Sequence, residues 1–282
     1  ISGITTLGTT SFTADATVNS VTVGKGANSV AGNTVLGETA LDAVTTGGDN
    51  TAVGKNALTE NTTGQYNAAF GVGALDANTS GDYNVGLGNY SLSANSTGDN
   101  NTGIGYGALF SSTTADDNTA VGKNSLLSNT TGAKNTAVGG YALDANTTGD
   151  NNVAFGYYAL GAATTADKNT ALGYYAAADI TTGVRNTAVG SEALRQKTTS
   201  TDNTAIGFNA MFQSSEGNHN TCVGASAGYN ISTGEYNTVV GSAALDANTT
   251  GVRNTALGYA ALTDNTTGGY NVALGMSALE NN

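Results

Sequence analysis

Apolar and polar residues follow each other along this chain in a pattern that repeats every 17 residues. Each repeat contains a five-residue stretch such as Asn50-Thr51-Ala52-Val53-Gly54. The closing glycine occurs fifteen times, from Gly37 to Gly275, without an insertion or deletion. So strict a spacing is typical of a solenoid, in which one small backbone unit stacks on copies of itself and any change of length would break the stack.

We number the positions of the repeat from its asparagine, which is position zero. Position zero is Asn in all fifteen copies, +1 is Thr in eleven, +2 is small, +3 is Val, Leu, Ile or Phe, and +4 is Gly. Ala or Ser follows at +7 and usually Leu at +8, and a sequence like Asn-Thr-Thr-Gly occupies +11 to +14. The first five positions predict a short strand, because β-branched residues alternate with small ones and a glycine ends the run.

The rest of the repeat predicts how the coils pack. A second short segment at +7 and +8 and a return turn at +11 to +14 would complete each coil. We expect the residues at +3 and +8 to meet as continuous apolar rows inside the stack (Val53 with Leu58, Phe155 with Leu160, Val189 with Leu194). Asparagines at position zero, repeated about every 4.8 Å, would form an amide ladder between coils. The sequence therefore predicts an all-β parallel β-solenoid of about fifteen 17-residue coils over residues 33–282, roughly 70 Å long.

Two segments allow other interpretations. Positions +5 to +10, as in residues 55–60, are also compatible with a helical turn, because Ala and Leu favour helix. Residues 1–32 do not share the repeat: residues 4–13 and 16–23 are rich in Thr and Val with alternating polarity, which predicts short strands. The stretch Val21-Thr22-Val23-Gly24 lies 13 residues before Gly37 and so breaks the register. We interpret residues 1–32 as a β-rich shaft or cap.

Composition narrows the possible partners. The 282 residues carry 21 acidic and 9 basic side chains, a net charge of −12, which argues against nucleic acid and anionic membranes as partners. No apolar run approaches the length of a membrane span. Large apolar residues are scarce for a chain of this length, which favours burial between copies of the chain. The single cysteine, Cys222, stands at the small position +2 and is expected to be a buried substitute for alanine.

At stretches such as Asn118-Thr119-Ala120-Val121-Gly122, the chain resembles the head-domain repeats of trimeric autotransporter adhesins and the related repeats of phage tail fibres. The resemblance covers about residues 33–282, although the commonest repeat of that family is shorter than 17 residues. It implies a left-handed β-roll, a homotrimeric extended fibre, and attachment to a cell surface. Residues 4–13 resemble the β-rich shafts of phage fibres, which favours a virion tail fibre over a bacterial cell-surface protein. Other fibre components, and a host surface glycan or protein, would then be its partners.

The sequence offers few candidates for chemistry. The only histidine, His219, occupies the variable position +16, and the aspartates at +9 are not in adjacent copies. A repeated calcium-binding motif is absent, so we predict no catalytic residue, no metal site and no cofactor. The tyrosines are more informative, because adjacent copies place four of them together at +5 and +6: Tyr157, Tyr158, Tyr174 and Tyr175. This patch predicts either a platform for sugar rings or another surface ligand, or packing between chains.

Three functional hypotheses follow. The first is a non-catalytic, structural and adhesive segment of a trimeric fibre. The second is a glycan-binding or depolymerising tailspike, against which the absence of irregular insertions in the repeat argues. The third is an ice-binding solenoid, because the Thr row at +1 is regular; Ala68, Val85, Val153 and Val272 interrupt that row.

Overall fold

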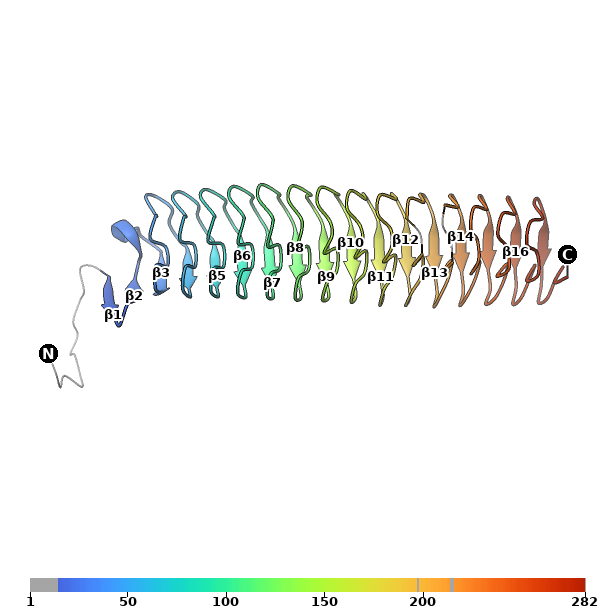
Figure 1. Cartoon of the computed structure of the whole chain (residues 1–282), viewed down its shortest axis with the longest axis horizontal. Helices are drawn as coiled ribbons and strands as arrows, with labels where there is room; N and C mark the ends of the chain where they lie inside the picture. Colours follow the sequence, from blue (N-terminus) through green and yellow to red (C-terminus); the bar gives the residue numbers. More distant parts are fainter. Residues whose placement is uncertain (1–14, 197, 214–215, 282) are drawn as a thin grey trace.

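The chain is a long, narrow stack of nearly identical coils (Figure 1). The computed structural model describes residues 15–196, 198–213 and 216–281. Within these residues all strands belong to one 17-stranded sheet, and the only helix is a short 3-10 turn, η1 (Ala27–Ser29). The fold is therefore all-β, and the predicted parallel β-solenoid is confirmed.

Each coil contributes one short strand to this sheet. The two N-terminal strands, which lie outside the repeat, are β1 (Ala16–Val18) and β2 (Val21–Gly24). The strands of the coils are β3 (Thr34–Gly37), β4 (Thr51–Val53), β5 (Ala68–Phe70), β6 (Val85–Leu87), β7 (Thr102–Ile104), β8 (Thr119–Val121), β9 (Thr136–Val138), β10 (Val153–Phe155), β11 (Thr170–Leu172), β12 (Thr187–Val189), β13 (Thr204–Ile206), β14 (Thr221–Val223), β15 (Thr238–Val240), β16 (Thr255–Leu257) and β17 (Val272–Leu274).

The coils stack in strict register. From β3 to β17 every strand pairs in parallel with the next, and each residue lies opposite the residue 17 positions later, as Ala137 does with Ala154. Backbone hydrogen bonds between coils also occur outside the strands, for example from Thr130 N to Thr147 O at 2.9 Å. One uniform coil length is what lets these bonds repeat along the whole stack, because an extra residue would shift every later donor away from its acceptor.

The helical alternative for positions +5 to +10 is wrong. Residues at +6 and +8 have left-handed backbone conformations, as shown by Asn56 with φ 59° and Leu58 with φ 53°. A right-handed helix cannot contain such residues at every second position. The segment is instead a series of turns whose N–H groups bond to the neighbouring coil, such as Leu58 N to Ala74 O at 3.0 Å.

The strand turns a different face to the interior than expected. The small residues at +2 are buried and pack with the leucines at +8, whereas the large residues at +3 lie on the outside; Phe155, for example, is 53 % exposed. The predicted contact of +3 with +8 is therefore wrong. Successive strand residues point to opposite sides, so burying position +2 necessarily exposes +1 and +3. We call this outer surface, made by positions +1 and +3 of the coils, the strand face.

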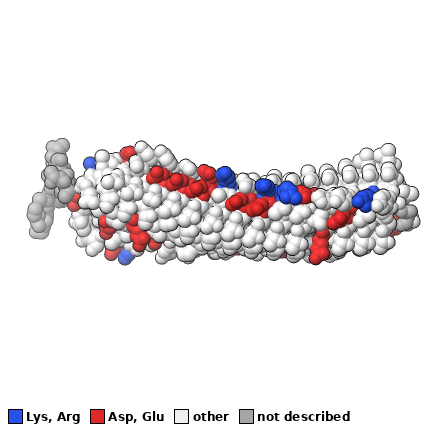
Figure 2. Space-filling view, turned by 90° about the horizontal axis from the view of Figure 1, so that it is seen from above, with Lys and Arg blue, Asp and Glu red and all other residues white. Residues whose placement is uncertain are grey.

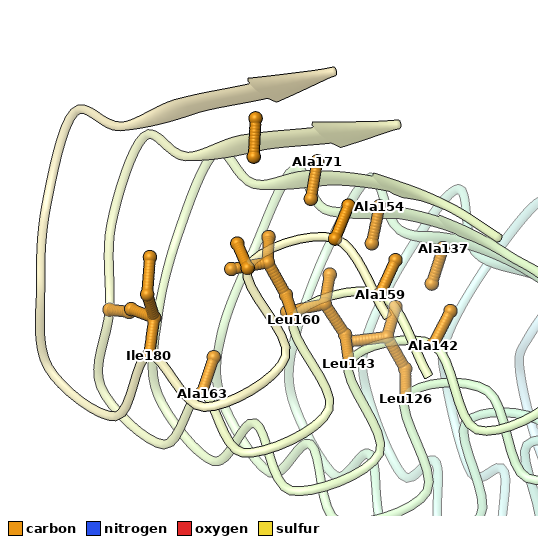
Figure 3. Close-up of a cluster of buried hydrophobic side chains, with 14 of the residues drawn as sticks. Leu126, Ala137, Ala142, Leu143, Ala154, Ala159, Leu160, Ala163, Ala171 and Ile180 are labelled. Carbon is orange, nitrogen blue, oxygen red and sulfur yellow. The ribbon is translucent and has the colours of Figure 1, made fainter. Parts of the chain in front are cut away.

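The interior is thin and is filled mainly by alanine and leucine. Figure 3 shows the alanine side chains of the strands pointing toward the row formed by Leu126, Leu143 and Leu160. All three leucines are fully buried. Where position +8 is smaller, a larger residue at +11 fills the space, as Ile180 does in the coil that has Ala177. Cys222 lies in this core as expected, beside Ile231 and the small Gly228.

The position-zero asparagines are buried in all coils but the last, and they hold each coil both to itself and to the next one. The Nδ2 of Asn135 donates to the carbonyl of Gly149 in the same coil at 2.7 Å. Its Oδ1 accepts the backbone N–H of Asn152, one coil later, at 2.9 Å, and the Nδ2 of Asn152 at 3.1 Å. The expected ladder therefore exists, and it also includes backbone bonds that the sequence did not suggest.

The N-terminal end of the stack is covered by a hairpin. Strands β1 and β2 pair antiparallel through a turn at Asn19 and Ser20, both with positive φ, and β2 pairs antiparallel with β3. The carboxylate of Asp15 accepts the backbone N–H groups of Lys25 and Gly26, both at 2.7 Å. The strand prediction for residues 16–23 and their break with the repeat are thus confirmed, while the strand expected within residues 4–13 lies outside the described residues.

Candidate ligand-binding surface

The four tyrosines selected from the sequence lie together, at the turn that follows the strand in two neighbouring coils. Tyr157 and Tyr174 are stacked, with ring centroids 5.9 Å apart and planes inclined by 18°. Tyr158 and Tyr175 are 5.1 Å apart, and Tyr174 meets Tyr175 edge-on at 4.5 Å. Such distances are those of favourable aromatic pairs. The structure therefore brings the four rings into one patch.

The backbone of the turn gives the two tyrosines of each coil different exposure to solvent. The residue at +6 has a left-handed conformation, with φ 56° at Tyr158 and φ 52° at Tyr175. As a result the +5 rings of Tyr157 and Tyr174 are exposed, whereas the +6 rings are half-buried. The +5 rings are the ones that a ligand in solution can reach.

The patch extends further than the sequence indicated. The guanidinium of Arg195 lies over the Tyr175 ring at 4.6 Å and near the Phe212 ring at 5.8 Å, and Phe212 stacks on Tyr229 at 5.3 Å. Arg195, Phe212 and Tyr229 all occupy position +9. We name the whole group, from Tyr141 to Tyr229, the aromatic row; its further members are Tyr157, Tyr158, Tyr174, Tyr175, Arg195 and Phe212. Position +9 of one coil adjoins position +6 of the coil before it, a neighbourhood that spacing alone did not reveal.

Small residues at +9 make room for the rings. A Cβ atom on Gly161 would lie 2.5 Å from Cε1 of Tyr158, so the ring occupies space that any side chain at this position would need. Ala178, one coil later, is buried. The +6 tyrosines can therefore lie against the coil surface because these two coils have small residues at +9.

Two carboxyl groups lie beside the half-buried tyrosines. Burial raises the pKa of Asp144 to about 6, against the lowering effect of the backbone N–H groups of Asp144 and Ala145. Its Oδ1 is buried and has no hydrogen-bond partner. Burial also raises the pKa of Asp179, which the charge of Arg195 partly offsets. The pKa of the Tyr158 hydroxyl is raised as well, first by burial and then by the charges of Asp144 and Asp179.

The raised pKa of Asp144 predicts a pH-dependent stability. The folded chain holds this proton more tightly than the unfolded chain, so the stabilisation is complete below the unfolded pKa of about 3.9 and is lost as the pH rises through about 6. Asp144→Asn mimics the protonated form. We expect the variant to melt at a higher temperature than the unmodified chain near pH 8, and the difference to shrink toward about pH 5.

The matched control for this experiment is Asp42→Asn. It removes one negative charge from the same repeat position, +9, but Asp42 is exposed and lies in an earlier coil. A melting-temperature difference between Asp144→Asn and the unmodified chain that stays constant with pH would contradict the assignment.

A second set of interactions follows positions +15 and +16. Carboxylates at +15 accept the backbone N–H of the preceding coil, as Asp99 does from Asp82 and Asp116 does from Asp99, at 2.7 and 2.8 Å. Figure 2 shows acidic and basic side chains along one line of the molecule. His219, at +16, stacks on Tyr236 at 4.8 Å, and its Nδ1 lies 3.8 Å from Asp202. These groups connect successive coils along the stack.

Other sites of possible chemistry are sparse in the described ranges. A hollow of about 260 Å³ is lined by polar side chains near the N-terminal end: Thr39, Asn56, Thr59, Glu60 and Asp76. Residues 15–196, 198–213 and 216–281 contain no group of three or more His, Cys, Asp or Glu side chains placed to hold a metal ion. Among the same residues, no helix has the length and apolarity needed to span a membrane.

Comparison with known proteins does not identify the chain: no family model, curated protein or solved structure matches it. The resemblance to adhesin and tail-fibre repeats therefore stays a prediction, and a functional proposal depends on the surfaces of the molecule itself.

Proposed function

We propose that the chain is a non-catalytic, structural and adhesive segment of an extended homotrimeric fibre that attaches to a surface, as viral tail fibres or bacterial surface adhesins do. The observation that carries the proposal is the strand face. Large apolar side chains at +3 are exposed along it in coils throughout the stack, including Phe155 at 53 %, Leu172 at 45 % and Leu257 at 44 %. Exposed apolar surfaces of this extent mark sites of interaction.

The strand face is suited to another copy of the same chain. No charged residue occurs at +1 or +3 in any of the fifteen copies. Its apolar side chains recur about every 4.8 Å, the distance between neighbouring strands, and a second copy of the solenoid carries apolar side chains at the same spacing. Copies packed side by side would therefore match at every coil.

The size of the strand face also agrees with a stable interface. Fourteen steps of about 4.8 Å and a strand width of about 10 Å give roughly 700 Å² for each copy. Stable protein interfaces bury about 800 Å² for each partner. Three copies with their strand faces toward a common axis would enclose the apolar rows, and three is the number that the resemblance to adhesin and tail-fibre repeats implies.

The architecture supports a mechanical role. Backbone and asparagine hydrogen bonds connect each coil to the next through the whole stack, so the coils form a continuous rod (Figure 1). A rod of this kind would separate an attachment point from the particle or cell that carries it. The partners of the fibre would be its own copies, adjoining fibre components and a host surface glycan or protein, with the virion tail fibre as the favoured location.

Placing charges on the strand face tests the proposal. In the variant Val138→Glu, Phe155→Glu and Leu172→Glu, three adjacent outward positions become acidic. We expect the molar mass in solution to fall from three chains to one, because like charges would meet around the axis without water. The control, Lys134→Glu, Asn151→Glu and Lys168→Glu, changes the +16 residue that directly precedes each of these three coils and should remain assembled. An unchanged mass of the strand-face variant would contradict the proposed interface.

The strand face also favours a second candidate, an ice-binding solenoid. Thr side chains of six consecutive coils, from Thr170 to Thr255, lie in one row on this uncharged face. The two functions exclude each other, because a trimer would cover the row. Thermal hysteresis together with a monomeric mass would support ice binding, and an absence of thermal hysteresis would dismiss this candidate.

A further inference from the structure

The rings of the aromatic row largely use their faces on one another. Tyr157 stacks on Tyr174 and also lies close to Gly140 of the preceding coil, where an added Cβ would be 3.6 Å from its Cδ2. Tyr158 lies over Gly161 and against Tyr175, and Arg195 covers the next face of Tyr175. A ligand that stacks on a ring therefore needs a place where this sequence of contacts is interrupted.

Such an interruption occurs in the +5 positions directly after Tyr174. The next coil has Ser191 at +5, and the coil after that has Phe208. Tyr174 is 53 % exposed and Phe208 is 56 % exposed, whereas Ser191 is half-buried. A ring is thus missing from one coil between two that carry rings.

The repeat spacing fits one additional ring over Ser191. Neighbouring coils are about 4.8 Å apart, so Tyr174 and Phe208 leave the backbone about 9.6 Å apart along the stack. A ring midway between them would lie about 4.8 Å from each. Stacked pairs in this molecule have similar separations, 4.9 Å for Tyr66 with Tyr83 and 5.9 Å for Tyr157 with Tyr174.

Polar groups of the same coil indicate the kind of ring. The hydroxyl of Ser191 follows directly on the strand turn, and the next residue is Glu192, whose carboxylate pairs with Arg195 at 3.1 Å. A pyranose offers apolar C–H faces to aromatic rings and carries hydroxyl groups around its edge. These hydroxyl groups can donate hydrogen bonds to a carboxylate, and they can donate to or accept from a serine hydroxyl. The net charge of −12 disfavours acidic sugars.

We propose that Tyr174, Ser191 and Phe208 form a binding site for a neutral pyranose, with the sugar ring held between the two aromatic side chains. This inference rests on the attachment role proposed above and names the class of surface ligand that one part of the fibre takes. It also moves the candidate site from the four tyrosines as a group to the open side of Tyr174.

The test measures binding of four methyl glycosides to the full chain by saturation-transfer NMR and calorimetry. The glycosides are those of glucose, galactose, mannose and N-acetylglucosamine. We expect at least one glycoside to bind. Ser191→Tyr places a ring where the sugar would lie, and Tyr174→Ala removes one stacking face; each should weaken binding about tenfold or more.

The control is Ser242→Tyr, which makes the same change at +5 of a coil that lies between Ala225 and Tyr259. It should leave glycoside binding unchanged, and it reports on any general effect of a new tyrosine on the fold. Binding by none of the glycosides, or equal binding by Ser191→Tyr, would overturn the proposal. Binding of a phenylalanine-containing peptide in place of the glycosides would overturn it too and indicate a protein ligand.

Measuring the molar mass of the same samples separates this proposal from the proposed fibre. A trimer that binds no glycoside contradicts the sugar site alone, whereas a monomer that binds a glycoside at Ser191 contradicts the trimer alone.

Discussion

Replacing Gly139 by alanine is expected to cost about 3 kcal/mol of stability, although the substitution removes no contact. Gly139 closes its strand at +4 with φ 131°, a conformation that other residues rarely adopt. A Cβ there would lie 2.5 Å from the carbonyl oxygen of Gly156 and 2.6 Å from its carbonyl carbon. Because both obstacles are backbone atoms of the next coil, the stack itself must shift to accept the methyl group.

Gly140→Ala provides the matched control. It adds the same methyl group one residue later, where the nearest atom is Cδ2 of Tyr157 at 3.6 Å, an ordinary contact. The control should be close to neutral. Hydrogen exchange at the amides of residues 136–156 is the measurement, because a stack of coils can open locally without unfolding as a whole. Equal protection in the two variants would show that the close approach of the glycines does not determine the fold.

Replacing Asn135 by alanine should destabilise the stack by roughly 1–3 kcal/mol, because a buried backbone N–H loses its partner. The change leaves the N–H of Asn152 without its acceptor, whereas the carbonyl of Gly149 keeps a second donor, the Nδ2 of Asn146 at 3.1 Å. Asn135 and Asn152 are fully buried, so water cannot replace the lost bonds without opening the coils. This cost explains physically why the repeat has asparagine, and no other polar residue, at position zero.

The appropriate control is Asn230→Ala, which removes an asparagine side chain from the half-buried position +10 of another coil. Its effect should be below about 1 kcal/mol, the usual range for surface positions. Chemical denaturation followed by circular dichroism measures both variants. A loss of stability for Asn135→Ala that is no greater than that of Asn230→Ala would contradict the structural role of the ladder.

The repeat length, the strand and the stacking of coils could be predicted from the sequence, because a strict period of 17 residues leaves few alternatives. The direction in which the strand faces could not be predicted by size alone. We expected the larger residue at +3 to be inside, but the space between strand and return segment holds only the small residue at +2, as Ala137 and Ala154 show. The invariant asparagine was the better indicator, because alternation places position +2 on the same side as position zero.

The candidate site was predicted in part. The positions +5 and +6 in adjacent copies of the repeat were enough to predict that Tyr157, Tyr158, Tyr174 and Tyr175 lie together. The contribution of Arg195 and of the small Gly161 depended on how the turn folds back, and the left-handed residues at +6 and +8 that set this path are not glycines in most coils. Such conformations are imposed by stacking on neighbouring coils and have no clear signature in a single repeat.

The molar mass of the unmodified chain, measured by light scattering on a size-exclusion column, tests the central claim most directly. Packing of the strand faces around a common axis predicts three times the mass of the 27.9 kDa chain. A mass of one chain at all concentrations would contradict the trimeric fibre and leave the apolar strand face exposed to water.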